Sequence, residues 1–126
     1  MSELGQKLVD ETRRVAESDP DRVFKGPCQY VVDGGPGCIV GHALFNLNMI
    51  DASFQDDDAN NDGIWGLNRR FNLDLDPEQY TWLRSIQDSQ DHNYSWGDAL
   101  KNADDDASRE NFYAADRYEF DECYDS

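Results

Sequence analysis

Residues 38–49 read CIVGHALFNLNM and predict the central buried helix of the fold. Five apolar side chains of this stretch fall on one broad stripe at helical spacing: Ile39, Val40, Ala43, Leu44 and Leu47. Recurrence at three and four positions is typical of a helix with a buried face, and Pro36 lies close to the first-turn position that proline favours. A strand over residues 38–41 stays open as an alternative, because Ile and Val suit either state.

The chain before this stretch predicts one helix and a short strand or hairpin. Apolar and small side chains recur from Leu4 to Ala16 behind Ser2, a good N-cap, and Asp19-Pro20 ends the pattern. Residues 28–32, CQYVV, favour a strand, and the following DGGPG supplies turn residues. A strand or hairpin arm is therefore expected near residues 28–33.

The chain after residue 49 predicts three more helices. Ile64, Leu67 and Phe71 indicate the first of them. Residues 76–79, DPEQ, combine an N-cap, a proline at the first helical position and a capping-box Gln, and start a helix that continues to about Gln90. Ser95 repeats the cap signature before a fifth helix. The fold class is mainly α, a single domain over residues 1–103, with an acidic aromatic tail over 104–126 that either packs on the domain or extends from it.

The charge balance sets the partners that the chain can have. The sequence has 27 acidic and 11 basic residues and a formal net charge of -16, most of it carried after residue 55. Such a field repels nucleic acid and anionic lipid and favours cations or basic protein surfaces. Direct nucleic-acid binding and membrane binding are therefore not expected. The alternative is that the excess of acid serves only solubility.

The segment 104–126 is where a basic partner is expected to bind. Acidic residues there alternate with aromatic ones, which can anchor a segment to a core or to a partner. The predicted partner-binding residues are Asp104, Asp105, Asp106, Glu110, Tyr113, Asp116, Tyr118, Asp121 and Glu122.

Residues 58–63 match the opening of an EF-hand calcium loop. Asp58, Asn60 and Asp62 supply oxygen ligands at the first, third and fifth positions, and Gly63 follows at the sixth. The twelfth position, where a bidentate Glu is needed, is Arg69. The favoured interpretation is therefore a polar loop in which Asn61 or Asp62 caps a helix. A calcium site remains the weaker alternative.

A second metal candidate is zinc at Cys28, Cys38 and His42. Cys38 and His42 lie four residues apart and share a face if the segment is helical, but paired ligands from two short knuckles are missing. A buried thiol within the apolar stripe is the favoured interpretation. No nucleotide, hydrolase or metalloprotease motif occurs, so neither a cofactor nor an enzymatic activity is predicted. The three cysteines are expected to be reduced.

The same residues carry a resemblance. The stretch CQYVVDGGPGCIVGHALFNLNMID, with NDGIWGL, DLDPEQYTWLRSIQDSQD and WGDALKNAD, resembles a group of small proteins of actinobacteria and their bacteriophages over residues 28–104. The group has no assigned activity, so the resemblance implies an origin and no mechanism. It makes a bacteriophage protein that acts on host machinery the expectation.

Two functions follow as hypotheses. The first is a non-catalytic acidic protein that binds a basic surface of a host protein, where carboxylates can stand in for nucleic-acid phosphates. The second is a metal-binding protein, structural or hydrolytic. The sequence has no stretch of about 18 apolar residues and its first residues lack the apolar core of a signal peptide, so a cytoplasmic location in the bacterial host is expected.

Overall fold

The computed structural model describes residues 2–26 and 29–108. In chain order the elements are α1 (Glu3–Ser18), β1 (Val31–Val32), β2 (Gly35–Pro36), α2 (Ile39–Asn46), the 3-10 helices η1 (Ala52–Asp56) and η2 (Asp58–Asn61), α3 (Ile64–Phe71), α4 (Pro77–Asp91) and α5 (Trp96–Ser108). The prediction of a small, mainly helical domain with five α-helices and a short hairpin is confirmed for these residues.

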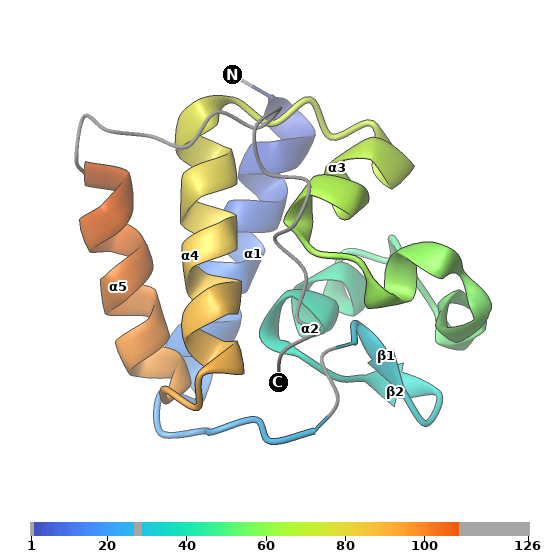
Figure 1. The fold of residues 1–126 in the computed structure, drawn as a ribbon, viewed down its shortest axis with the longest axis horizontal. Helices are drawn as coiled ribbons and strands as arrows, with labels where there is room; N and C mark the ends of the chain where they lie inside the picture. The colour runs from blue at the N-terminus through green and yellow to red at the C-terminus, as the bar shows by residue number, and fades with distance from the viewer. Residues whose placement is uncertain (1, 27–28, 109–126) are drawn as a thin grey trace.

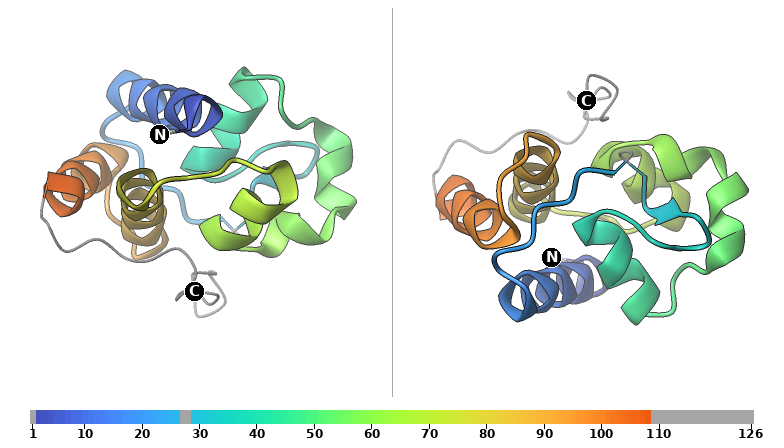
Figure 2. Two further views of the ribbon diagram at one scale, coloured as in Figure 1. Left: turned by 90° about the horizontal axis from the view of Figure 1, so that it is seen from above. Right: turned by 90° about the horizontal axis from the view of Figure 1, so that it is seen from below.

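The three long helices α1, α4 and α5 pack against one another at one end of the molecule (Figures 1 and 2). Helix α2 packs on α1, and α3, η1, η2 and the hairpin form the other end. Helix α4 is the most enclosed, because Tyr80, Leu83 and Ile86 are fully buried along it. None of the helices in the described ranges is both long and apolar enough to cross a membrane.

Side-chain caps fix the starts of the long helices where the sequence predicts them. The Ser2 hydroxyl accepts from the Gly5 N–H at 2.9 Å. Asp76 and Gln79 form a complete capping box at the start of α4, with bonds of 2.8 and 3.1 Å. The Ser95 hydroxyl accepts from the Asp98 N–H at 3.2 Å. Each bond satisfies a helix donor that has no partner within its own helix, so these predicted boundaries hold.

The hairpin spans residues 31–36, so it begins later than the strand or hairpin predicted near residues 28–33 and includes Pro36, which the sequence placed near the start of the helix. Val31 pairs with Pro36 and Val32 with Gly35, so Asp33 and Gly34 alone form the turn. Their φ angles of 53° and 80° are both positive, as a two-residue turn of the type I′ class requires. Pro36 therefore ends the hairpin instead of opening α2. Residues 27 and 28 lie outside the described residues.

Helix α2 begins at a buried junction formed by Tyr30, Cys38, Ile39, Gly41 and Gln90, which we call the α2 junction. Cys38 is the N-cap and makes no capping bond with its side chain. The buried Gln90 amide from α4 replaces it, because its Oε1 accepts from the Ile39 N–H at 2.6 Å. The alternative of a strand over 38–41 is thus excluded by a helix whose first donor is satisfied from another helix.

Gly41 allows the hairpin to approach α2. A Cβ built on Gly41 would overlap the Tyr30 carbonyl oxygen and lie 2.9 Å from the Tyr30 carbonyl carbon. That carbonyl also accepts from the Gly37 N–H at 2.9 Å. The backbone of the hairpin thus lies directly on the helix, at a distance that only glycine permits.

Candidate functional site

The predicted acidic tail begins within a helix. Helix α5 runs to Ser108, so Asp104, Asp105 and Asp106 are helical residues packed beside α4 and not the start of a separate segment. The predicted boundary after residue 103 therefore does not coincide with the end of the helix. The other predicted partner-binding residues lie outside the described residues: Glu110, Tyr113, Asp116, Tyr118, Asp121 and Glu122.

Asp104 joins α5 to the two other long helices. Its carboxylate accepts two bonds from the Arg13 guanidinium, at 2.9 and 2.5 Å, and one from the Trp82 indole N–H at 2.8 Å. The same guanidinium lies 5.4 Å from the centre of the Trp82 ring. The Arg13 hydrogen bonds, opposed by partial burial and assisted by Trp82, lower the pKa of Asp104. Asp104 is therefore a structural ion-pair residue as well as a predicted binding residue.

Asp106 is also bound within the molecule. Its carboxylate accepts from the Ser85 hydroxyl of α4 at 2.7 Å. Both side chains line a groove of about 700 Å³ between α4 and α5, together with Asp88, Asp105 and Tyr94. Tyr94 is 49% exposed, which is unusual for a large side chain in this molecule. The groove is a polar surface with three carboxylates along it.

The loop that the sequence offered as the weaker, calcium-binding alternative does not adopt the geometry of an EF-hand. Residues 58–61 form η2, which Asp57 caps by accepting from the Ala59 N–H at 2.9 Å. Asn60 is 1% exposed and turns inward, where its side chain bonds to the N–H and C=O of Val31 at 2.8 and 3.1 Å. Because Asn60 holds the hairpin, it does not converge with Asp58 and Asp62 on a common cation.

The predicted helix cap at this loop is also wrong in its residue. Helix α3 has Gly63 as its N-cap and no side-chain capping bond. Asn61 instead accepts from the Gln29 side chain at 2.7 Å. The capping residue of the segment is Asp57, one turn earlier, because the chain forms η2 before it enters α3. The sequence pattern gave the right residue type at the wrong helix.

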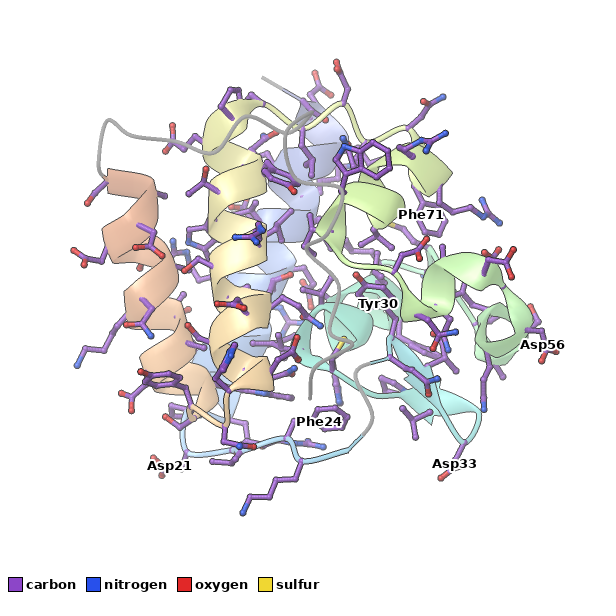
Figure 3. The ribbon with its side chains drawn as sticks, in the orientation of Figure 1. Asp21, Phe24, Tyr30, Asp33, Asp56 and Phe71 are labelled. Atoms are coloured by element: carbon purple, nitrogen blue, oxygen red, sulfur yellow. The ribbon has the colours of Figure 1, made fainter. Side chains whose placement is uncertain are left out.

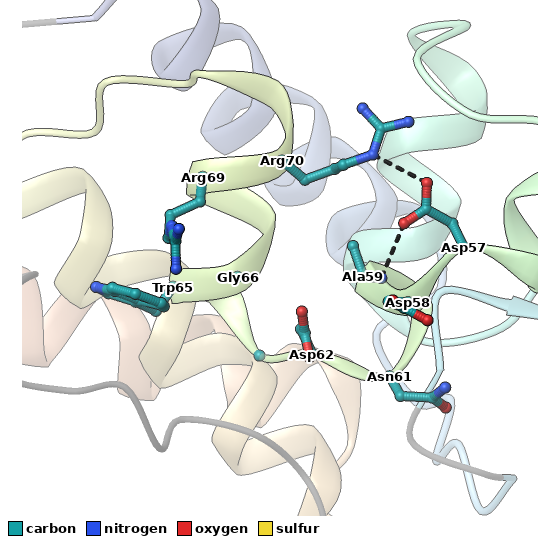
Figure 4. A pocket seen from close by; sticks show the side chains of 10 residues that line it. Asp57, Asp58, Ala59, Asn61, Asp62, Trp65, Gly66, Arg69 and Arg70 are labelled. Carbon is teal, nitrogen blue, oxygen red and sulfur yellow. Dashed lines mark hydrogen bonds and ion pairs between the residues drawn. The ribbon is translucent and has the colours of Figure 1, made fainter.

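An open hollow of about 590 Å³ lies between η2 and α3 (Figure 4). Asp58 and Asp62 line one wall, and their side chains make no ion pair or hydrogen bond with other described residues. Trp65 and Arg69 line the other wall, with the guanidinium 4.7 Å from the ring centre. Arg70 binds Asp57 at 2.9 Å. Two unengaged carboxylates therefore stand opposite a stacked arginine.

Cys38 is a buried structural thiol. It is fully inaccessible, and burial raises its pKa to about 12, although the Gln87 side chain opposes the shift. The thiol is therefore protonated at neutral pH and is not suited to nucleophilic attack. Within residues 2–26 and 29–108, no three His, Cys, Asp or Glu side chains converge on a common metal position. His42 lies on the same helix and contacts Trp96, and Cys28 is outside the described residues.

Acidic side chains lie on the surface throughout the described residues, where no Asp or Glu is buried. Asp21, Asp33 and Asp56 mark this at the edge of the molecule (Figure 3). Four arginines form ion pairs within the molecule: Arg13 with Asp104, Arg14 with Glu11, Arg22 with Asp19, and Arg70 with Asp57. These four arginines are thus paired with acids of the same chain, and because acids outnumber bases 27 to 11, a surplus of carboxylates remains.

One acidic group was not among the predicted binding residues. Asp51, Asp56, Asp57, Asp58 and Asp62 occur within residues 51–62 without any basic residue. These residues lie in and beside η1 and η2, at the end of the molecule opposite α5 (Figure 1). The available signal was five aspartates within twelve residues that contain no base. Comparison of the chain with protein-family models, with curated proteins and with solved structures finds no match.

Proposed function

We propose that this protein is a non-catalytic acidic protein that binds a basic surface of a host protein. The observation that carries the proposal is the distribution of charge: every described carboxylate is at the surface, while four arginines are paired with acids of the same chain. A surface of this kind attracts a basic protein and repels nucleic acid. The resemblance to proteins of actinobacteria and their bacteriophages makes a host protein the expected partner.

Two acidic regions are candidates for the contact. The first is the end of α5 with the chain after it, which holds all the partner-binding residues predicted from the sequence. The second is the 51–62 segment, where the side chains of Asp56, Asp58 and Asp62 have no bond to other described residues. A carboxylate with no internal partner gives up less on binding than one that must first leave an ion pair. This favours the 51–62 segment for part of the contact.

Nucleic-acid mimicry is the more specific form of the proposal. Carboxylates can occupy the positions that phosphates take on a basic, nucleic-acid-binding surface. Binding then releases the counterions of that surface and weakens steeply with salt, as it does for nucleic acid itself. The expected partner is therefore a nucleic-acid-binding protein of the host.

The proposal is tested by affinity capture of the full chain from an actinobacterial lysate at low and at high salt, with and without a calcium chelator. Captured proteins are identified by mass spectrometry, and each is then tested for competition by duplex DNA. A partner that is lost at high salt, retained with the chelator and displaced by DNA supports mimicry. Capture that requires calcium would instead support the metal-binding alternative.

Matched variants locate the contact. Replacing Asp56, Asp58 and Asp62 together with Asn removes three charges from the 51–62 segment, and replacing Glu3, Asp10 and Glu17 with their amides removes three from α1. Both variants have the same net charge. A larger loss of affinity in the first variant supports a specific contact, whereas equal losses would reduce the effect to net charge alone.

A further inference from the structure

His42 occupies a half-buried position between three segments of the chain. Its Nε2 atom is closed off from solvent and has no hydrogen-bond partner among the described residues. Its ring meets the Trp96 ring edge-on, with the centroids 5.3 Å apart and the planes at 71°. Trp96 is 1% exposed, and its indole Nε1 likewise has no partner in the described chain. The contact therefore packs two polar rings in a space that supplies neither with a hydrogen bond.

Trp96 also holds the connection that follows α1. Its backbone N–H donates to the Arg22 carbonyl at 2.8 Å, and the next N–H, of Gly97, donates to the Pro20 carbonyl at 2.8 Å. The Arg22 guanidinium lies 4.8 Å from the centre of the Trp96 ring. His42 of α2, residues 19–26 and the first turn of α5 thus meet at one place, which we call the His42 corner.

The charges around the corner oppose a second cation. Residues 19–26 present Arg22 and Asp19, whose nearest ion-pair atoms are 3.9 Å apart. Burial and the Arg22 charge lower the pKa of His42, and the Asp19 charge acts in the opposite direction. The Asp91 charge, from α4, raises the pKa of Cys38, which lies one turn before His42. Helix α5 contributes the uncharged Trp96 ring. Neutral imidazole fits this environment, and imidazolium does not.

We propose that the His42 corner is an acid-sensitive latch: neutral His42 lets α2, residues 19–26 and the start of α5 close on one another, and protonation opens them. An imidazolium has an N–H on both nitrogens, and the closed corner offers Nε2 no acceptor. The charged ring must therefore turn toward solvent. Its departure removes the wall on which Trp96 and the stacked Arg22 rest, so the opening is local to the corner.

The direction of the pH effect follows from linkage. A histidine whose pKa is lower in the folded than in the unfolded state binds fewer protons when folded, so stability increases with pH. The cost of protonation appears as the pH falls below the unfolded value, about 6.5. It increases the equilibrium constant for opening by at most about tenfold per pH unit. This device is independent of the proposed partner, since it lies at the start of α5, whereas Asp104, Asp105 and Asp106 lie near the end of that helix.

The test compares wild type with His42→Gln and with the matched control His92→Gln. His92 is the other histidine of the chain, and its side chain is 57% exposed. Hydrogen exchange of the full chain is followed at pH 7.5 and 5.5 by mass spectrometry, with the intrinsic pH dependence of exchange removed. In wild type and His92→Gln, opening of residues 19–26 and 94–100 is expected to increase several-fold at the lower pH, and in His42→Gln it is expected to stay constant.

A second variant covers the case in which His42→Gln does not fold. Arg22→Gln removes the cation that opposes protonation, and the Arg22 side chain is 42% exposed, so the fold should tolerate the change. The acid-induced opening of the corner is expected to shrink in this variant. The proposal is overturned if His42→Gln, or Arg22→Gln in its place, keeps the wild-type response. It is also overturned if exchange increases equally in all helices, because that would be global unfolding.

Discussion

The α2 junction and the acidic surface differ in how tightly the structure constrains their residues. At the junction, Gly41 lies against the Tyr30 backbone and Gln90 satisfies the first N–H of α2, all in the interior. On the acidic surface, carboxylates are exposed and several make no bond to other described residues. A buried site tolerates few alternatives because packing and hydrogen bonding must both be satisfied, whereas an exposed charge has water as a partner.

This difference also bears on the resemblance to actinobacterial and bacteriophage proteins that we propose from the sequence. Tyr30, Cys38, Gly41 and Gln90 of the quoted motif all belong to the α2 junction, and Trp96 of its last segment belongs to the His42 corner. The residues on which this proposed resemblance rests are therefore residues that pack α2 in this chain, and none of these five lies on the acidic surface.

The largest effect is expected from Gly41→Ala. An added Cβ would overlap the Tyr30 carbonyl, so the hairpin or α2 must move, at a cost of about 3 kcal/mol in the free energy of unfolding. An open site in a helix would instead gain about 1 kcal/mol from alanine. Urea denaturation measures the change. Gly35→Ala is the control, because its nearest neighbour to an added Cβ is 4.0 Å away. A stabilised Gly41→Ala protein would show that the junction is not tight.

A smaller loss is expected from Gln90→Met. The thioether fills the space but leaves the buried Ile39 N–H without an acceptor, which costs about 1 to 3 kcal/mol. Gln55→Met is the matched control, since Gln55 accepts from the Gly34 N–H in an exposed position where water can replace it. Denaturation midpoints of the two variants are compared. Equal losses would mean that burial of the bond is not what matters.

Asp104→Asn is expected to destabilise the protein by only about 1 kcal/mol. The side chains of Arg13 and Asp104 are 37% and 45% exposed, so solvent screens their ion pair. A double-mutant cycle with Arg13→Gln isolates the pair. The pKa of Asp104 is lowered, so its contribution is present above the ordinary Asp range and is lost as the pH falls through the folded value. A cycle with no coupling energy would contradict the structural role.

The smallest effect on stability is expected from Asp58→Asn with Asp62→Asn. Both side chains are exposed and without a bond to other described residues, so the free energy of unfolding should change by less than about 0.5 kcal/mol. Thermal denaturation with and without added calcium checks this. A large loss in the free energy of unfolding, or a stabilisation by calcium that the double variant abolishes, would show that the loop binds a cation. The loop would then be constrained in its residues as the α2 junction is.

The positions of the five helices were predictable because each depends on local residues. The spacing of apolar side chains and the caps at Ser2, Asp76 and Ser95 act within a few positions of one another in the chain. The hairpin turn was predictable for the same reason, since Asp33-Gly34 suits positive φ. The roles of Asn60 and Asp104 were not, because their partners Val31 and Arg13 are far away in the sequence.

By itself, the sequence determined the helical class, the helix starts and the excess of negative charge, since periodicity, capping and composition are local or additive properties. Only the tertiary structure decided which carboxylates are bound internally and which are available, because that depends on which donor faces each one across the fold. It likewise decided that Gln90 caps α2 and that His42 meets Trp96. Contacts between distant segments are fixed by packing, and no local pattern encodes them.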